Sequence, residues 1–104
     1  MSQARVEALE AMKRRNPADT RILFALAAEY EKLGRWDDAV KELEAYLSRA
    51  DDQGNAYGRL GNALFRTGRF EDAKAAYRKG VEAARRHVHP GMAAEFEEIL
   101  EQMG

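Results

Sequence analysis

The sequence predicts an all-α protein built from a repeated pair of helices. When the chain is shifted by 34 residues it matches itself, so that LGRWDDA (33–39) returns as TGRFEDA (67–73). Within each repeat the apolar residues recur every three or four positions, which is the spacing of one helical face. No segment alternates apolar and polar residues for long enough to indicate a strand. A match at one fixed offset is typical of helical repeat proteins.

The first repeat predicts two helices joined by a tight turn. Asp19 or Thr20 stands where an N-cap is expected, and Gly34 stands where the first helix should end in a left-handed residue. We expect the two helices to pack on each other through their apolar faces. Those faces consist of Leu23, Leu26, Tyr30 and Leu33 in the first helix, and of Trp36, Ala39, Val40, Leu43 and Leu47 in the second.

The second repeat has the same plan, with Gly68 at its turn. Its two apolar faces consist of Tyr57, Leu60, Leu64 and Phe65, and of Phe70, Ala73, Tyr77 and Val81.

Both ends of the chain extend the pattern by one helix. Residues 2–15 occupy the place of a second helix whose partner is missing, and Pro90 is suited to the first position of a closing helix over 90–103. We therefore expect one domain over 1–104, with a half-repeat at 2–15, repeats at 20–53 and 54–87, and a capping helix at 90–103. The apolar faces of the end helices consist of Val6, Leu9 and Met12, and of Met92, Phe96, Ile99, Leu100 and Met103.

This pattern resembles the tetratricopeptide repeat family, of the small bacterial type. The resemblance rests on the 34-residue period, on the turn glycines followed by an aromatic residue (Trp36 or Phe70), and on one proline between repeats, Pro17. The family's small residues at helix contacts correspond to Ala27 with Ala39 and to Gly61 with Ala73.

The sequence departs from the family's pattern at two places. Asp51 and Asp52 stand where a second proline is usual. Tyr46 stands at a position that is usually small, whereas Gly80 keeps that position small in the second repeat. We expect Gly58 to make room for Tyr46.

The resemblance implies a right-handed superhelix (an α-α solenoid) of about six helices, with the first helix of each repeat on a concave face. Phe24 and Phe65 are the informative residues there, because they either widen the core or serve as apolar anchors for a ligand. We expect Ala94 and Glu98 to continue the face in the last helix. The residues that the superposed repeats place on it are Arg21, Phe24, Ala28, Glu31, Asn55, Gly58, Arg59, Asn62, Phe65 and Arg66.

The predicted function is a protein–protein interaction or scaffold module that binds a peptide or helix in this groove. Asn62 and Arg66 match part of the family's clamp for a peptide carboxylate, but Phe24 and Ala28 stand where the clamp needs Lys and Asn. A ligand with an apolar anchor and an acidic group suits the groove better. The alternative is a self-assembling unit that forms homodimers or larger oligomers through its end helices.

Composition and motifs argue against other functions. The 104 residues are 45% hydrophobic and 34% charged with a net charge of −1, and cysteine is absent. The longest apolar run, 22–28, is too short to span a membrane, and residues 1–13 lack the apolar core of a signal peptide, so we expect a cytoplasmic protein. His87 and His89 supply at most two metal ligands.

No catalytic or phosphate-binding motif is recognisable, so we expect no enzyme activity and no cofactor. Three carboxylate pairs are interpreted as helix caps and partners of helix dipoles. Two arginine pairs at predicted helix C-termini are too few for a nucleic-acid surface. These pairs are Asp37–Asp38, Asp51–Asp52, Glu97–Glu98, Arg14–Arg15 and Arg85–Arg86.

Overall fold

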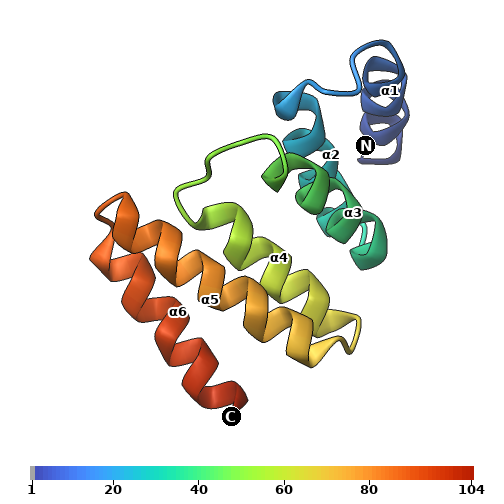
Figure 1. Cartoon of the computed structure of the whole chain (residues 1–104). Coiled ribbons are helices and arrows are strands. Elements are labelled where there is room, and N and C mark those ends of the chain that lie inside the picture. Colours follow the sequence, from blue (N-terminus) through green and yellow to red (C-terminus); the bar gives the residue numbers. More distant parts are fainter. Residues whose placement is uncertain (1) are drawn as a thin grey trace. The chain divides into compact units, whose positions relative to one another are not determined.

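The computed structural model describes the backbone of residues 2–104 and the side chains from Gln3 onward. The described chain contains six helices and no strand, which confirms the all-α prediction (Figure 1). Contacts divide it into two compact units, Met1–Ala50 (unit 1) and Asp51–Gly104 (unit 2). The helices are α1 (Ser2–Arg15), α2 (Thr20–Lys32), α3 (Trp36–Leu47), α4 (Asn55–Arg66), α5 (Phe70–Arg86) and α6 (Pro90–Met103).

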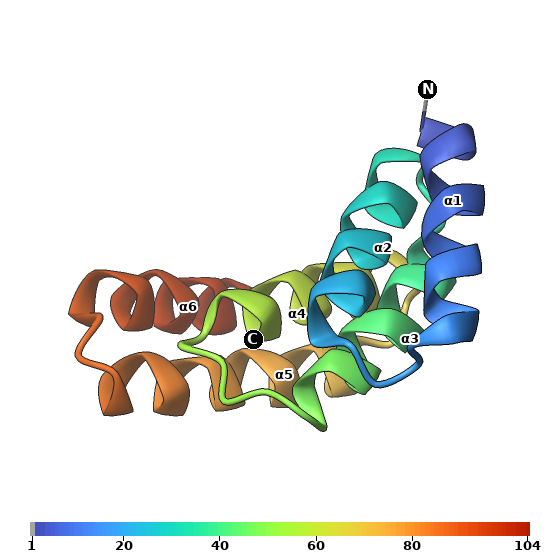
Figure 2. The same ribbon diagram turned by 90° about the horizontal axis from the view of Figure 1, so that it is seen from above.

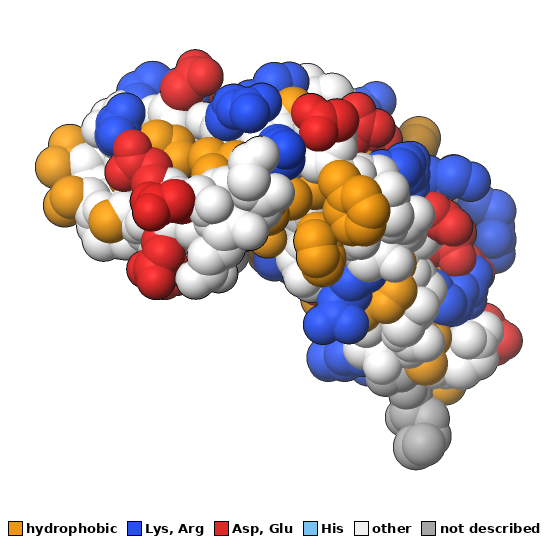
Figure 3. All heavy atoms as spheres, turned by 90° about the horizontal axis from the view of Figure 1, so that it is seen from below, with side chains coloured by type: hydrophobic (Ala, Val, Ile, Leu, Met, Phe, Trp, Pro, Cys, Tyr) orange, Lys and Arg blue, Asp and Glu red, His pale blue; other side chains and the backbone are white. Residues whose placement is uncertain are grey.

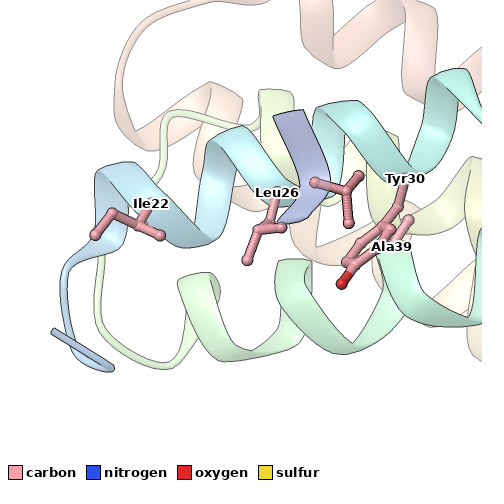
Figure 4. Packing of buried hydrophobic residues seen from close by; sticks show 5 residues of the cluster. Ile22, Leu26, Tyr30 and Ala39 are labelled. Atoms are coloured by element: carbon pink, nitrogen blue, oxygen red, sulfur yellow. The ribbon is translucent and has the colours of Figure 1, made fainter. Parts of the chain in front are cut away.

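In unit 1, α2 packs against both α1 and α3. The apolar face of α2 carries Ile22, Leu26 and Tyr30 at helical spacing, and all three lie in one cluster with Val6 and Ala39 (Figure 4). Val6, Leu26 and Ala39 are fully buried. Since a buried aliphatic side chain contributes about 1.5–3 kcal/mol, this short stripe supplies much of the free energy that holds α1 to the repeat.

In unit 2, α5 packs against both α4 and α6, which lie together on one side of it (Figure 2). Phe96 of α6 is buried beside Tyr77 of α5, with their ring centroids 5.7 Å apart. Val81, Ala84 and Ala93 complete this cluster. The C-terminal helix therefore closes the second repeat with its own apolar face, as the sequence predicts.

The predicted turn glycines end their helices in the left-handed conformation, with φ of 71° at Gly34 and 80° at Gly68. After α2, the amide of Gly34 donates to the Glu31 carbonyl and the amide of Arg35 donates to the Tyr30 carbonyl. This pair of bonds defines a Schellman motif, and α4 ends in the same way. Of the two predicted caps for α2, Asp19 is the one that accepts the Arg21 amide, at 3.0 Å.

Within unit 2, the space over Gly58 is occupied by Phe96. A Cβ on Gly58 would lie 2.6 Å from the Phe96 ring, and a Cβ on Gly80 would lie 2.9 Å from the same ring. Both distances are too short for a real side chain, so the two glycines form a socket that accepts Phe96. In unit 1, Tyr46 packs on Phe24 of its own repeat, with ring centroids 4.9 Å apart.

Candidate functional site

A groove runs between α4 and α6, with α5 as its floor. One part is a cleft of about 280 Å³ lined mainly by polar residues of α4 and by Glu95 of α6, over Tyr77 and Phe96. The lining of this polar half is Asn55, Gly58, Arg59, Asn62, Tyr77, Glu95, Phe96 and Ile99.

A second cavity, of about 340 Å³, continues the groove and shares Asn62, Tyr77 and Ile99 with the first. It is lined by Asn62, Phe65, Tyr77, Ile99, Gln102 and Met103. This apolar half offers an aromatic ring, a β-branched chain and a flexible methionine, which suit an apolar side chain of a ligand. Burial raises the pKa of the Tyr77 hydroxyl above its ordinary value.

Phe65 stands at the mouth of the apolar half with 48% of its surface exposed. The ring of Phe70, which is 52% exposed, lies 5.1 Å away at the start of α5 but does not line the cavity. Two exposed aromatic rings in contact are uncommon on a surface that only solvent touches. They are therefore the most conspicuous apolar feature beside the groove.

Half of the ten predicted groove residues line these two cavities: Asn55, Gly58, Arg59, Asn62 and Phe65. Arg66, the last residue of α4, is exposed and lines neither cavity. The other four, Arg21, Phe24, Ala28 and Glu31, lie on α2 in unit 1. There Phe24 is half-buried against Tyr46, and Arg21 is exposed beside Asp19.

Ala94 and Glu98, which we expected to continue the concave face, do not line these two cavities. Both are exposed and neither lines the groove, which is instead lined by the next residue in each case, Glu95 and Ile99. One residue is a rotation of about 100° about a helix axis. No repeat match extends over α6, so the sequence leaves this rotation open. The spacing of Glu95, Ile99, Gln102 and Met103 is that of one helical face and could have indicated the groove wall.

The histidine pair is engaged with the loop before α4. Nε2 of His89 lies 2.6 Å from Oε1 of Gln53. Nε2 of His87 is buried 3.2 Å from Oδ2 of Asp51, without the geometry of a hydrogen bond. The His87 imidazole and the Arg86 guanidinium hold the pKa of Asp51 below its usual range. Within the described chain, no group of three potential metal ligands occurs.

The carboxylate pairs are only partly explained by helix starts. Asp52 accepts the amides of Gly54 and Ala56, each at 2.8 Å, and so organises the first turn of α4. Asp38 lies in the first turn of α3 and pairs with Arg35 at 2.9 Å. Glu97, however, lies in the middle of α6 and pairs with Arg85, so the capping interpretation is wrong there.

The surface drawn in Figure 3 carries basic and acidic side chains interspersed with small apolar groups. The arginine pairs lie in the last turns of α1 and α5, where cations stabilise the helix dipole. Among the helices that the structure describes, none combines the length and the apolar character needed to cross a membrane.

Within each unit, every helix packs on the next one along the chain, and the groove of unit 2 lies between α4 and α6. This arrangement is typical of a helical-repeat protein. A model of the tetratricopeptide repeat family matches residues 24–88, which is most of both repeats. The chain is also similar to the small glutamine-rich tetratricopeptide repeat-containing protein 2 of Mycosarcoma maydis, with 36% identity over 87 residues. That match covers 81% of this chain and 24% of the relative, so the chain spans about a quarter of the relative's length.

The chain belongs to the tetratricopeptide repeat family. Membership confirms the family that the sequence resembles and supports a general role in protein–protein interaction.

Proposed function

We propose that this protein is an interaction module that binds a peptide or helix of a partner protein in the groove between α4 and α6. The observation that carries the proposal is Phe65, an aromatic ring that is half exposed at the mouth of an apolar cavity. Aromatic side chains at the edge of a concavity are frequent centres of binding energy, because a ligand can desolvate them at little cost in entropy.

The two halves of the groove define the ligand's chemistry. An apolar side chain of the ligand fits among Phe65, Ile99 and Met103, while polar groups of the ligand face Asn55 and Asn62. Arg59 lines the same polar half, so an acidic group close to the apolar anchor matches its charge. The module acts in the cytoplasm, without catalysis or cofactor.

Phe65 and Phe70 provide a matched pair of variants. Peptides selected from a random display library on the wild-type protein would be titrated against Phe65→Ala and Phe70→Ala by fluorescence anisotropy. Because the two rings are similarly exposed but only Phe65 lines the cavity, we expect at least a tenfold loss of affinity for Phe65→Ala and less than threefold for Phe70→Ala. Circular dichroism would verify that both variants keep their helicity. Equal losses, or no loss for Phe65→Ala, would refute the groove as the binding surface.

A further inference from the structure

The loop between α5 and α6 carries an unusual backbone conformation. Three helices of the chain, α2, α4 and α5, end in the same Schellman motif. In the first two the left-handed residue is glycine, whereas in the third it is Val88, with φ of 59°. For α5 the amide of Val88 donates to the Arg85 carbonyl, and the amide of His89 donates to the Ala84 carbonyl at 2.7 Å.

A valine is a poor choice for this position. Its branched Cβ collides with the backbone in the left-handed region, which is why this conformation is rare for β-branched residues. The Val88 side chain is 79% exposed, so burial does not repay the strain. The loop is therefore strained where the chain could relax by extending.

The helix that follows this loop, α6, is held to the rest of unit 2 by a side chain that enters the glycine socket. Phe96 inserts between Gly58 and Gly80, and no real side chain could replace either glycine hydrogen without displacing the ring. Helix α6 is further held by the Arg85–Glu97 ion pair and by Lys74, whose ammonium donates to the Gly104 carbonyl at 2.9 Å. Every one of these contacts is between α6 and the rest of unit 2, so an α6 from another copy can make them equally well.

We propose that α6 exchanges between two copies of this chain, so that each copy's Phe96 fills the glycine socket of the other. When residues 87–89 extend as a hinge, Val88 leaves the left-handed region. The contacts that α6 loses within its own chain are then made again with the partner copy. Strained short hinges favour such exchange. Pro90 shapes the open form, because the residue before a proline is biased towards extended backbone, so α5 and α6 do not fuse into one helix.

The exchange would make the groove a shared site. Its α4 wall, with Asn62 and Phe65, would belong to one copy, and its α6 wall, with Glu95, Ile99 and Met103, would belong to the other. This inference concerns the loop and the socket, and it does not depend on which ligand the groove binds.

The association is tested first by the mass of the full chain in solution. Light scattering after size exclusion, between about 10 µM and 1 mM, should show a dimer whose fraction rises with concentration. Val88→Gly removes the strain from the closed loop, so we expect its dimer to dissociate about tenfold more readily. Val88→Ala keeps a Cβ in the left-handed region and should stay within about threefold of wild type. A monomer throughout, or a Val88→Gly dimer as tight as wild type, would overturn the proposal.

The crossing of α6 is tested by NMR on the dimer. A mixture of isotope-labelled and unlabelled chains, unfolded and refolded together, would be examined for intermolecular nuclear Overhauser effects. Contacts from the Phe96 ring of one chain to the α-protons of Gly58 and Gly80 of the other are expected. If the dimer shows these contacts only within a chain, α6 does not exchange. Because Val88→Gly relieves strain in the closed loop, misfolding is not the expected cause of its weaker dimerisation.

Discussion

In unit 1 the outer helix α1 adds ion pairs with two buried carboxylates to its apolar contacts, whereas in unit 2 the outer helix α6 buries an aromatic ring. Lys13 of α1 donates to both carboxylate oxygens of Glu42, each at 3.0 Å. Arg5 of α1 lies 3.2 Å from Glu29. On α6, Phe96 fills its glycine socket and packs on Tyr77.

Residues 34 positions apart make this comparison direct. Glu29 and Glu42 are both nearly fully buried in unit 1, and the equivalent residues of unit 2 are the buried alanines Ala63 and Ala76. The reverse holds for the aromatic pair. Phe24 and Tyr46 pack on each other in the first repeat, and both equivalent positions in the second repeat are the glycines of the socket.

The clefts of the two units also differ in their content of charged side chains. The cleft of unit 1, of about 500 Å³, is lined by Glu10, Lys13, Arg14 and Glu42 together with Pro17, Leu26 and Tyr30. The hydroxyl of Tyr30 donates to Glu10 at 2.6 Å, and burial together with that carboxylate raises the Tyr30 pKa well above its ordinary value.

One repeat frame therefore supports two kinds of helix attachment. A repeat with aromatic residues at positions 24 and 46 fills that space itself, and its neighbouring helix adds ion pairs to its apolar contacts. A repeat with glycines there leaves a space that the neighbour must fill. Unit 1 should respond to changes in charge, and unit 2 should respond to changes in side-chain volume.

The largest expected effect is that of Phe96→Ala. Truncating a buried phenylalanine costs about 3–5 kcal/mol, and here the glycine socket has no side chain with which to fill the cavity. Urea denaturation followed by circular dichroism should show this loss, and hydrogen exchange should locate it in α4–α6. Phe24→Ala, at a half-buried site, should cost less than half as much. Equal losses for the two variants would show that unit 2 does not depend more strongly than unit 1 on the volume of one aromatic side chain.

Removal of one partner of a buried ion pair should have the next largest effect. Lys13→Met leaves the Glu42 carboxylate buried without its cation, and we expect a loss of about 1–3 kcal/mol in the free energy of unfolding. Adding Glu42→Ala, which copies Ala76 of the second repeat, should recover much of that loss. A double-mutant cycle by urea denaturation measures both steps. If the second substitution adds to the loss, the charge of Glu42 is not what makes Lys13 necessary.

The repeat frame could be predicted because its determinants are local. The turn glycines, the Asp19 cap and the spacing of apolar residues each act within about one helical turn, and all are present where expected. The polar attachment of α1 was not predicted, because nothing in the local sequence distinguishes a buried Glu29 from a solvated one. That distinction arises only when α1 packs on α2 and α3.

The groove was predicted only as far as the repeat reaches. Asn55 to Phe65 lie on α4, whose register follows from its 34-residue match to α2. The α6 wall lies beyond the second repeat, so no repeat match fixes its register, and Glu95 and Ile99 were not singled out. Phe96 was recognised as a core residue, but its socket could not be, because Gly58 and Gly80 meet it from two different helices.

The two turn glycines should respond alike, in contrast to the outer helices. Gly34→Ala and Gly68→Ala each force an alanine into the left-handed region, where open space surrounds the new methyl group. The strain of about 1–2 kcal/mol is partly offset by the reduced entropy of the unfolded chain, so we expect a loss of roughly 0.5–1 kcal/mol for each. Thermal unfolding of both variants measures this. A loss that differs by more than twofold would show that the turns are not equivalent.

The smallest expected effect is a dependence of unit 1 on acid. Burial raises the pKa of Glu29, but the Lys32 ammonium and the Arg5 guanidinium outweigh burial, so its pKa lies below the ordinary value. A folded pKa below the unfolded one means that Glu29 stabilises the fold above about pH 4.3 and that this contribution is lost as the pH falls through the folded pKa.

Trp36 is the chain's one tryptophan and lies in unit 1, so its fluorescence reports on that unit in urea titrations at successive pH values. Wild type should lose stability between about pH 5 and pH 3, the range around the carboxyl pKa. Glu29→Ala, which copies Ala63, should remove part of that slope. Asp51 in unit 2 also has a lowered pKa, but its side chain is 69% exposed, so solvent screens its partners and Asp51→Asn should change the slope little. If Asp51→Asn flattened the acid response more than Glu29→Ala does, the assignment of charge sensitivity to unit 1 would be reversed.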